Sequence, residues 1–121
     1  MNEQPIGMNE LAGAPPYALE DGELDRLWRE ALAYLPEKII ALDDDPTGTQ
    51  TVHGVPVYTD WSEETLQAAF ADPSRLVFIL TNSRSFSAEK TAEAHRDIGA
   101  AAARAGRRRG LSFMLISRGD S

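Results

Sequence analysis

Short hydrophobic runs separate longer stretches of mixed character along this chain. Runs at 38–42, 76–80 and 111–116 are predominantly aliphatic or aromatic, without the alternation of a half-exposed strand. Such runs are typical of strands that are buried on both faces of a sheet. A shorter run at 55–58 predicts one more strand. It follows the first strand after only about a dozen residues, the lower limit for a parallel crossover. The connection therefore holds a helical turn at 49–53, or the short strand lies elsewhere in the sheet.

Apolar residues recur at helical spacing between these runs. The first such segment, 21–35, has acidic residues at its start and Pro36 after its end, and both features favour a helix with these limits. Its Trp28 is interpreted as a core residue. A second helix is expected from the capping box at 60–63 through about Phe70.

The third expected helix runs from near Ser87 to Arg104, and Gly106 closes it. Many residues on one of its faces are alanines, which implies a close approach to a sheet. His95 lies on the same face and is interpreted as a packed residue. Arginines at 104 and 107–109 fall where the helix dipole favours cations.

Strands separated by helices predict an α/β fold, with a mostly parallel sheet and helices on both faces in a Rossmann-like, three-layer arrangement. Residues 1–18 contain several prolines and glycines without periodicity, which predicts a flexible N-terminal arm. Residues 19–121 then form the domain. Its last strand reads as a central one and only a single loop follows it, so we expect an incomplete domain, the N-terminal part of something longer.

Composition narrows the classes of function. The chain has 12 basic and 19 acidic residues, a net charge of −7 and a pI near 4.7, which argues against binding to nucleic acid or to an anionic membrane. It contains no cysteine, which excludes disulfides and thiolate metal sites and favours a cytoplasmic location. No apolar run reaches the length of a membrane span. A small-molecule function fits these limits.

Polar side chains follow three of the expected strands, in the loops 43–50, 81–85 and 117–121. Because the carboxyl ends of parallel strands share one edge of a sheet, these loops are expected to converge on a single crevice. Its lining would combine carboxylates, hydroxyls, one amide and two guanidinium groups, namely Asp43, Asp44, Asp45, Asp120, Thr47, Thr49, Thr81, Ser83, Ser117, Ser121, Asn82, Arg84 and Arg118.

This mixture suits a small polyhydroxy acid. Arginine grips a carboxylate through paired hydrogen bonds, whereas Asp and Asn bind hydroxyls. One aspartate could also take a proton from an attacking hydroxyl. The alternative for Arg84 and Arg118 is a structural ion pair with the same aspartates, and both arrangements can hold in an empty site. With the arginines in place, we expect an organic-acid pocket and not a metal site.

Three motifs carry a resemblance to a known family. Asp44-Asp45-x-Thr47-Gly48, the Ser83-Arg84 pair and the segment 118–121 (Arg-Gly-Asp-Ser) follow the right strands in the right order. Over residues 38–121 the chain resembles the N-terminal, sugar-binding domain of the four-carbon acid sugar kinases. The resemblance implies that the full enzyme phosphorylates threonate, erythronate or an oxo-tetronate with ATP and Mg²⁺.

In that family the N-terminal domain holds the sugar acid, and a C-terminal domain binds ATP. The sequence matches only the first four residues of the third motif, at 118–121, and we expect the nucleotide-binding domain to be missing from this chain. The resemblance implies catalytic roles for Asp44 and Asp45, one of which orients or deprotonates the attacking hydroxyl. The implied substrate-binding residues are Asp44, Asp45, Thr47, Gly48, Asn82, Ser83, Arg84, Arg118, Asp120 and Ser121.

Two other functions fit parts of the sequence. The pattern Asp43-x-Asp45-x-Thr47, with Thr81 after a later strand, also resembles haloacid-dehalogenase-type phosphatases, in which Asp43 would be the nucleophile and Asp45 the acid/base. The later lysine and acidic motifs of those enzymes are absent from this chain. A non-catalytic fragment that binds sugar acids is the third possibility.

Overall fold

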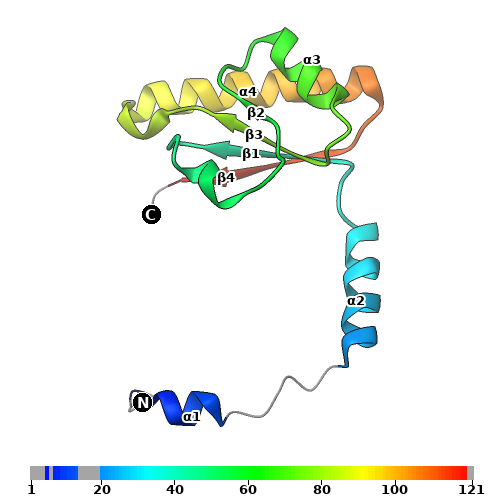
Figure 1. Ribbon diagram of the computed structural model, residues 1–121. Helices are drawn as coiled ribbons and strands as arrows, with labels where there is room; N and C mark the ends of the chain where they lie inside the picture. The colour runs from blue at the N-terminus through cyan, green and yellow to red at the C-terminus, as the bar shows by residue number, and fades with distance from the viewer. Residues whose placement is uncertain (1–4, 6, 14–19, 120–121) are drawn as a thin grey trace. The chain divides into compact units, whose positions relative to one another are not determined.

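The computed structural model describes residues 5, 7–13 and 20–119 (Figure 1). The chain divides into two compact units, 1–35 and 36–121. In the first unit, α1 spans Met8–Ala12 and α2 spans Asp21–Ala33. The sequence places a flexible arm at 1–18; its residues 8–12 form α1, and residues 14–18 lie outside the described residues.

The helix predicted at 21–35 is confirmed as α2, which ends two residues earlier. The interpretation of Trp28 as a core residue is wrong, because the residue is 64% exposed and no residue of α2 is buried. Helical spacing identifies the apolar side of a helix but not whether a partner surface covers it.

The second unit contains the sheet. Its elements in chain order are β1 (Lys38–Asp43), η1 (Gly48–Thr51), β2 (Val57–Tyr58), α3 (Glu63–Ala71), β3 (Leu76–Leu80), η2 (Ser83–Ser85), α4 (Ala88–Arg109) and β4 (Phe113–Arg118). The strands are ordered β2-β3-β1-β4, and every pair is parallel. The predicted α/β fold with a parallel sheet is confirmed. The short strand β2 pairs with β3, and the connection before it contains the helical turn η1.

The register of the sheet aligns the three strand ends that matter for function. Asp43 at the end of β1 pairs with Leu80 at the end of β3 and with Arg118 at the end of β4. The loops that follow these strands therefore leave the sheet from one edge, on the left in Figure 1.

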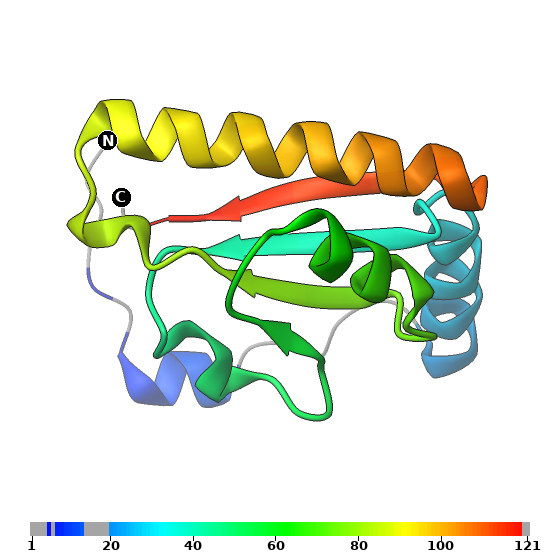
Figure 2. The ribbon, with the colours of Figure 1, turned by 90° about the horizontal axis from the view of Figure 1, so that it is seen from above.

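Helices α3 and α4 lie on the same side of the sheet (Figures 1 and 2). They enclose one core between helices and strands, made of Ile40, Leu42, Leu66, Ala69, Phe70, Val77, Ile79, Ile98, Ala101, Ala102 and Ala105. Within the described residues of this unit, the second helical layer that the sequence predicts is not seen. Three alanines of α4, at 101, 102 and 105, are buried in this core together with residues of the strands.

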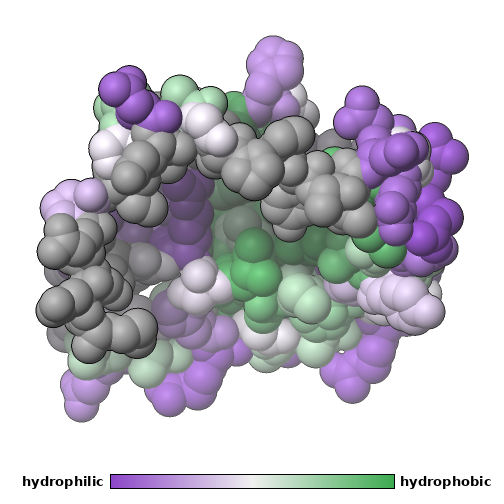
Figure 3. Space-filling view, turned by 90° about the horizontal axis from the view of Figure 1, so that it is seen from below, coloured by the Kyte–Doolittle hydropathy of each residue, from purple (hydrophilic) through white to green (hydrophobic). Residues whose placement is uncertain are grey.

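The strand β4 is half exposed, which corrects the prediction of a buried strand at 111–116. Phe113 and Leu115 pack against the core, whereas Met114 and Ile116 are 44% and 41% exposed. Since alternate residues of a strand point to opposite faces, the exposed pair lies on the side without helices. Figure 3 views the molecule from that side and shows hydrophobic residues in the middle.

The sequence suggested that Gly106 closes α4, and this prediction is wrong. The helix continues to Arg109, and Gly110 ends it in the left-handed conformation with φ of 64°. Gly106 lies inside the helix, where a Cβ atom would be 3.0 Å from the Cδ1 atom of Phe113. Its lack of a side chain serves the packing of α4 on β4.

The capping box predicted at 60–63 places the N-cap at the wrong residue. The N-cap of α3 is Ser62, whose hydroxyl accepts the backbone N–H of Thr65 at 3.1 Å. Asp60 supports this cap, because its carboxylate accepts the Ser62 backbone N–H at 3.1 Å and the Thr65 hydroxyl at 2.5 Å. The N-cap therefore lies two residues later than the box implied.

Candidate functional site

The carboxylate of Asp43 organises the loop that follows β1. The residue is 2% exposed, and its Oδ1 accepts the backbone N–H of Asp45 at 3.1 Å. Among the described residues, its buried Oδ2 has no hydrogen-bond partner. A Cβ atom at position 48 would lie 1.8 Å from this oxygen, so the loop can close over Asp43 only with Gly48 there.

Asp45 is held as an ionised hydrogen-bond acceptor. Its Oδ1 accepts the backbone N–H of Thr47 at 2.9 Å. This backbone hydrogen bond is the main reason why the pKa of Asp45 is lowered. A hydrogen bond with the Thr47 side chain and the charge of Arg84 lower the pKa further, whereas burial raises it. The carboxylate therefore stays charged at neutral pH.

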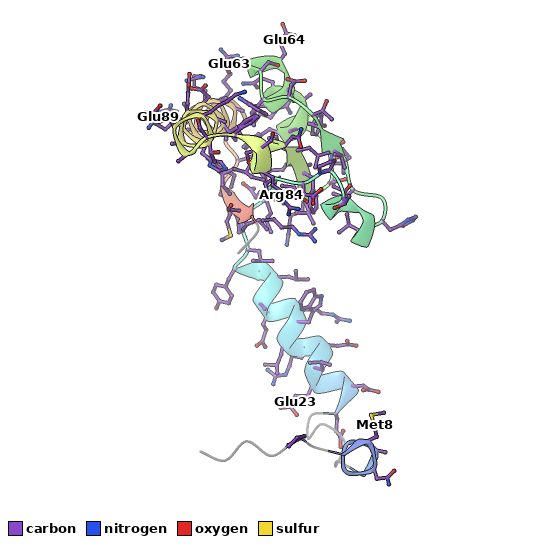
Figure 4. The ribbon with its side chains drawn as sticks, turned by 90° about the vertical axis from the view of Figure 1, so that its left-hand side faces the viewer. Met8, Glu23, Glu63, Glu64, Arg84 and Glu89 are labelled. Carbon is purple, nitrogen blue, oxygen red and sulfur yellow. The ribbon has the colours of Figure 1, made fainter. Side chains whose placement is uncertain are left out.

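Arg84 joins the loop after β3 to the loop after β1. Its Nη1 lies 2.7 Å from Asp45 Oδ2 and its Nη2 lies 3.8 Å from Asp44 Oδ1, while its backbone N–H donates to the Asp44 carbonyl at 3.4 Å. Its side chain is 50% exposed. Figure 4 looks at the carboxyl-end edge of the sheet and shows Arg84 in the middle of that edge. The guanidinium group is thus anchored by the protein and still open to solvent.

Arg118 joins the end of β4 to the same loop. Its Nη1 donates to the Gly48 carbonyl at 2.5 Å and lies 3.8 Å from Asp43 Oδ2. The side chain is 44% exposed. Together with Arg84, it brings the three strand-end loops into contact, which is the convergence expected from the sequence.

These loops surround a cavity of about 290 Å³. Its lining consists of charged and small residues, namely Asp43, Asp44, Asp45, Thr47, Gly48, Arg84, Arg118 and Gly119. A second cavity of about 140 Å³ adjoins it and is lined by Leu42, Asp44, Thr81, Ser83, Thr91, His95, Ser117, Arg118 and Gly119. Asp44, Arg118 and Gly119 line both, so the two cavities are neighbours.

The predicted site residues fall into three groups. Asp44, Asp45, Thr47, Gly48, Arg84 and Arg118 line the larger cavity, and Ser83 lines the smaller one. Asn82 is not among the described residues that line either; it is exposed and adopts a left-handed conformation with φ of 52° at the turn into η2. Asp120 and Ser121 lie outside the described residues.

Thr91 and His95 were not among the residues that the sequence assigned to the site. Both come from α4 and are half-buried, and both line the smaller cavity. His95 was interpreted as a packed residue. Their separation of four positions on one helix face is the only signal in the sequence that links them.

A larger and more open hollow of about 580 Å³ lies between α4 and the start of α3. Trp61 lines it, and the ion pair between Arg104 and Glu63 lies beside it. It gathers residues from two segments only, 59–63 and α4, and from none of the loops after β1, β3 and β4. The chemistry is concentrated at the smaller cavities, because three loops deliver charged groups there.

The carboxylates of the site do not form a metal centre by themselves. Over the part of the chain that the structure describes, no three His, Asp or Glu side chains are grouped so that they could hold a metal ion. Guanidinium groups lie beside all three aspartates of the loop. In the same described residues, no helix has the length and apolar character to cross a membrane.

Residues 39–121 match the family of sugar-binding N-terminal domains. The chain therefore belongs to the family of the N-terminal domain of the four-carbon acid sugar kinases, as its motifs suggested. The matched range begins within β1 and includes the whole site. Searches of curated proteins and of solved structures found no match to this chain.

Proposed function

We propose that this chain binds a four-carbon sugar acid, of the threonate, erythronate or oxo-tetronate type, and forms the acceptor part of an ATP-dependent kinase. One observation carries the proposal. Arg84 and Arg118 reach from two different strand ends to the acidic loop after β1, so that guanidinium groups, carboxylates and a threonine line a single cavity. Family membership supports a sugar as the ligand class.

The size and polarity of the cavity favour a small ligand rich in oxygen. Its volume of about 290 Å³ is at the lower end for ligand sites, which commonly hold about 300–1,000 Å³. Ordinary ligand sites are mostly apolar, whereas this one is lined almost entirely by charged and polar groups. A short acid with several hydroxyls matches such a lining.

In this proposal, Arg84 and Arg118 bind the carboxylate of the acid. Both side chains are about half exposed, at 50% and 44%. A guanidinium group has five N–H donors, so it can bind a ligand carboxylate while it keeps a contact to the acidic loop. The ion pairs with the acidic loop thus hold the arginines in position for the ligand.

Asp44 and Asp45 bind hydroxyl groups, and Asp45 orients the one that is phosphorylated. The lowered pKa of Asp45 keeps it ionised, so it can accept the proton of a hydroxyl in a hydrogen bond but is a weak base. Phosphoryl transfer depends mainly on position and charge neutralisation, so a weak base is sufficient. The role of Asp45 is accordingly to align the hydroxyl oxygen.

In this proposal, a separate nucleotide-binding domain binds ATP and Mg²⁺. The residues of this chain do not fit them, because guanidinium groups lie beside the acidic cluster and no metal-holding group occurs in the described ranges. No step of the reaction is therefore assigned to them here. A cytoplasmic location, where ATP is available, completes the proposal.

The phosphatase alternative requires an accessible nucleophile at Asp43. That residue is 2% exposed, and Gly48 packs directly against its carboxylate. Its Oδ2 atom is buried, so this oxygen gives a phosphorus atom no open approach. The geometry thus favours sugar-acid binding over an aspartyl-phosphate mechanism.

Calorimetric titration of threonate and erythronate into the full chain tests the proposal. We expect one of these acids to bind, and Arg84→Ala to weaken that binding about tenfold or more, because a charge-assisted hydrogen bond is lost. Arg108→Ala, which removes an exposed arginine at the end of α4, is the matched control and should bind as the wild type does. Unchanged binding in Arg84→Ala would contradict the assignment. Binding without phosphate transfer from ATP, even with a nucleotide-binding domain supplied, would instead support the non-catalytic alternative.

A further inference from the structure

The smaller cavity extends the site toward α4. It holds about 140 Å³, several times the roughly 30 Å³ that one water molecule occupies in the liquid, and it shares Asp44 and Arg118 with the larger cavity. A ligand of four carbons that is held by the arginines can place one substituent in it. The lining of this cavity then decides which substituent fits.

The hydrogen bonds of Thr81 and Ser83 determine what the cavity offers. The Thr81 hydroxyl lies 3.1 Å from the backbone carbonyl of Asp43, which can only accept, so Thr81 donates its single proton there. The Ser83 hydroxyl lies 2.8 Å from the Thr81 hydroxyl. Since the proton of Thr81 is already used, Ser83 must donate to Thr81. Ser83 therefore presents only lone pairs to a ligand in the cavity.

Because Ser83 offers only an acceptor, it favours a ligand substituent that can donate a hydrogen bond. Ser83 is 8% exposed, and the neighbouring Asp44 is also an acceptor when ionised. Acceptors in the lining of a cavity disfavour a carboxylate but bind the proton of an alcohol. Arg118, which lines the same cavity, can donate to the oxygen of that alcohol. The lining thus matches a hydroxyl group better than the acid group.

His95 of α4 is a further polar residue in the lining of this cavity. Its imidazole is half-buried and, within the described residues, makes no side-chain hydrogen bond or ion pair. A neutral imidazole has one donor and one acceptor nitrogen, so it can bind either side of a hydroxyl. A polar ring that faces a cavity without a protein partner is available to a ligand.

We propose that the smaller cavity receives one secondary hydroxyl of the sugar acid and that Ser83 and His95 determine the stereochemical preference of the site. This inference rests on the proposed function. Diastereomeric acids point the corresponding hydroxyl in different directions. The wrong isomer leaves buried polar groups unpaired, and a site built to bind a hydroxyl discriminates strongly against a ligand that does not supply one.

The test is calorimetric titration of threonate and erythronate into the full chain and its variants. The wild type should prefer one acid by about tenfold or more, the expected effect of one lost hydrogen bond to a buried group. Ser83→Ala and His95→Ala should each weaken the preferred acid and bring the two affinities close together. Controls are Ser85→Ala and His53→Ala, which change exposed residues outside both cavities and should keep the preference.

The outcomes separate the two proposals. If neither acid binds the wild type, the proposed function fails, and this inference fails with it. If the wild type binds both acids equally, or if Ser83→Ala and His95→Ala keep the wild-type preference, sugar-acid binding stands and the stereochemical role is wrong. Ser83 and His95 lie on different elements and are tested separately, so an unfolded variant at one position leaves the other to decide.

Discussion

The Cα atom of Gly48 lies so close to the carboxylate of Asp43 that a Cβ atom would be 1.8 Å from Asp43 Oδ2. Gly48→Ala should therefore destabilise the fold by about 1–3 kcal/mol, the usual cost of overpacking a buried site. Urea denaturation measures the change. Gly99→Ala is the matched control, since its Cβ would have no atom within 4 Å, and it should stabilise α4 by about 0.5–1 kcal/mol. Equal effects at the two glycines would contradict the packing described.

The aromatic pair Phe70 and Phe113 lies across the core, with ring centroids 5.5 Å apart at an interplanar angle of 78°. Phe70 is 2% exposed, so Phe70→Ala should lower the free energy of unfolding by about 3–5 kcal/mol. Phe86→Ala is the control, because this half-buried ring contacts Lys90 at the start of α4 and lies outside the core. It should cost about 1 kcal/mol. A similar cost at both positions would mean that the core is wrongly placed.

Three aspartates accept backbone N–H groups two residues further on, and these hydrogen bonds make stability depend on acid pH. The pKa values of Asp45, Asp60 and Asp72 are all lowered from 3.8, and hydrogen bonds are the main cause in each. A lowered pKa in the folded state means that the unfolded chain binds protons more readily. Their stabilisation is therefore complete above the ordinary pKa of 3.8 and is lost as the pH falls through the lower folded-state values.

Asp60→Asn tests this dependence, since the amide keeps an acceptor oxygen for Ser62 but cannot titrate. The loss of stability on acidification should be smaller in this variant than in the wild type, as urea denaturation at several pH values would show. Because Asp60 is exposed, the difference should be modest. An identical pH profile would show that the hydrogen bonds of Asp60 are not coupled to folding.

The low pKa of Asp45 also bears on ligand binding. Asp45→Asn should weaken the sugar acid about tenfold, since a neutral amide accepts a hydroxyl proton less strongly and loses the ion pair that positions Arg84. Titration calorimetry gives the affinity. Asp97→Asn, an exposed aspartate on α4 outside both site cavities, should bind as the wild type does. A wild-type affinity in Asp45→Asn would remove Asp45 from the site.

The sequence predicted the parallel sheet and the meeting of three loops because both follow from local pattern. Continuous apolar runs mark strands, and polar residues directly after them mark the edge where ligands bind. The match of Asp43, Leu80 and Arg118 in register is a consequence of that arrangement.

The errors arose where packing between distant segments decides the outcome. Gly106 looked like a helix end but serves contact with Phe113, while Gly110 ends the helix. Ile116 looked buried because neighbouring residues are apolar, yet one face of β4 is exposed. His95 is half-buried, and its place in the lining of the smaller cavity did not follow from its position on an apolar helix face. None of these relations can be derived from spacing along the chain alone.

The central claim is that Arg84 and Arg118 hold the carboxylate of a four-carbon acid at the edge of the sheet. The most direct measurement compares the affinity of the full chain for threonate and erythronate with its affinity for the matching uncharged polyols, threitol and erythritol. We expect the preferred acid to bind at least about tenfold more tightly than its polyol, and the double variant Arg84→Ala/Arg118→Ala to lose this difference. Equal affinity for acid and polyol in the wild type, or a difference that survives in the double variant, would contradict the account.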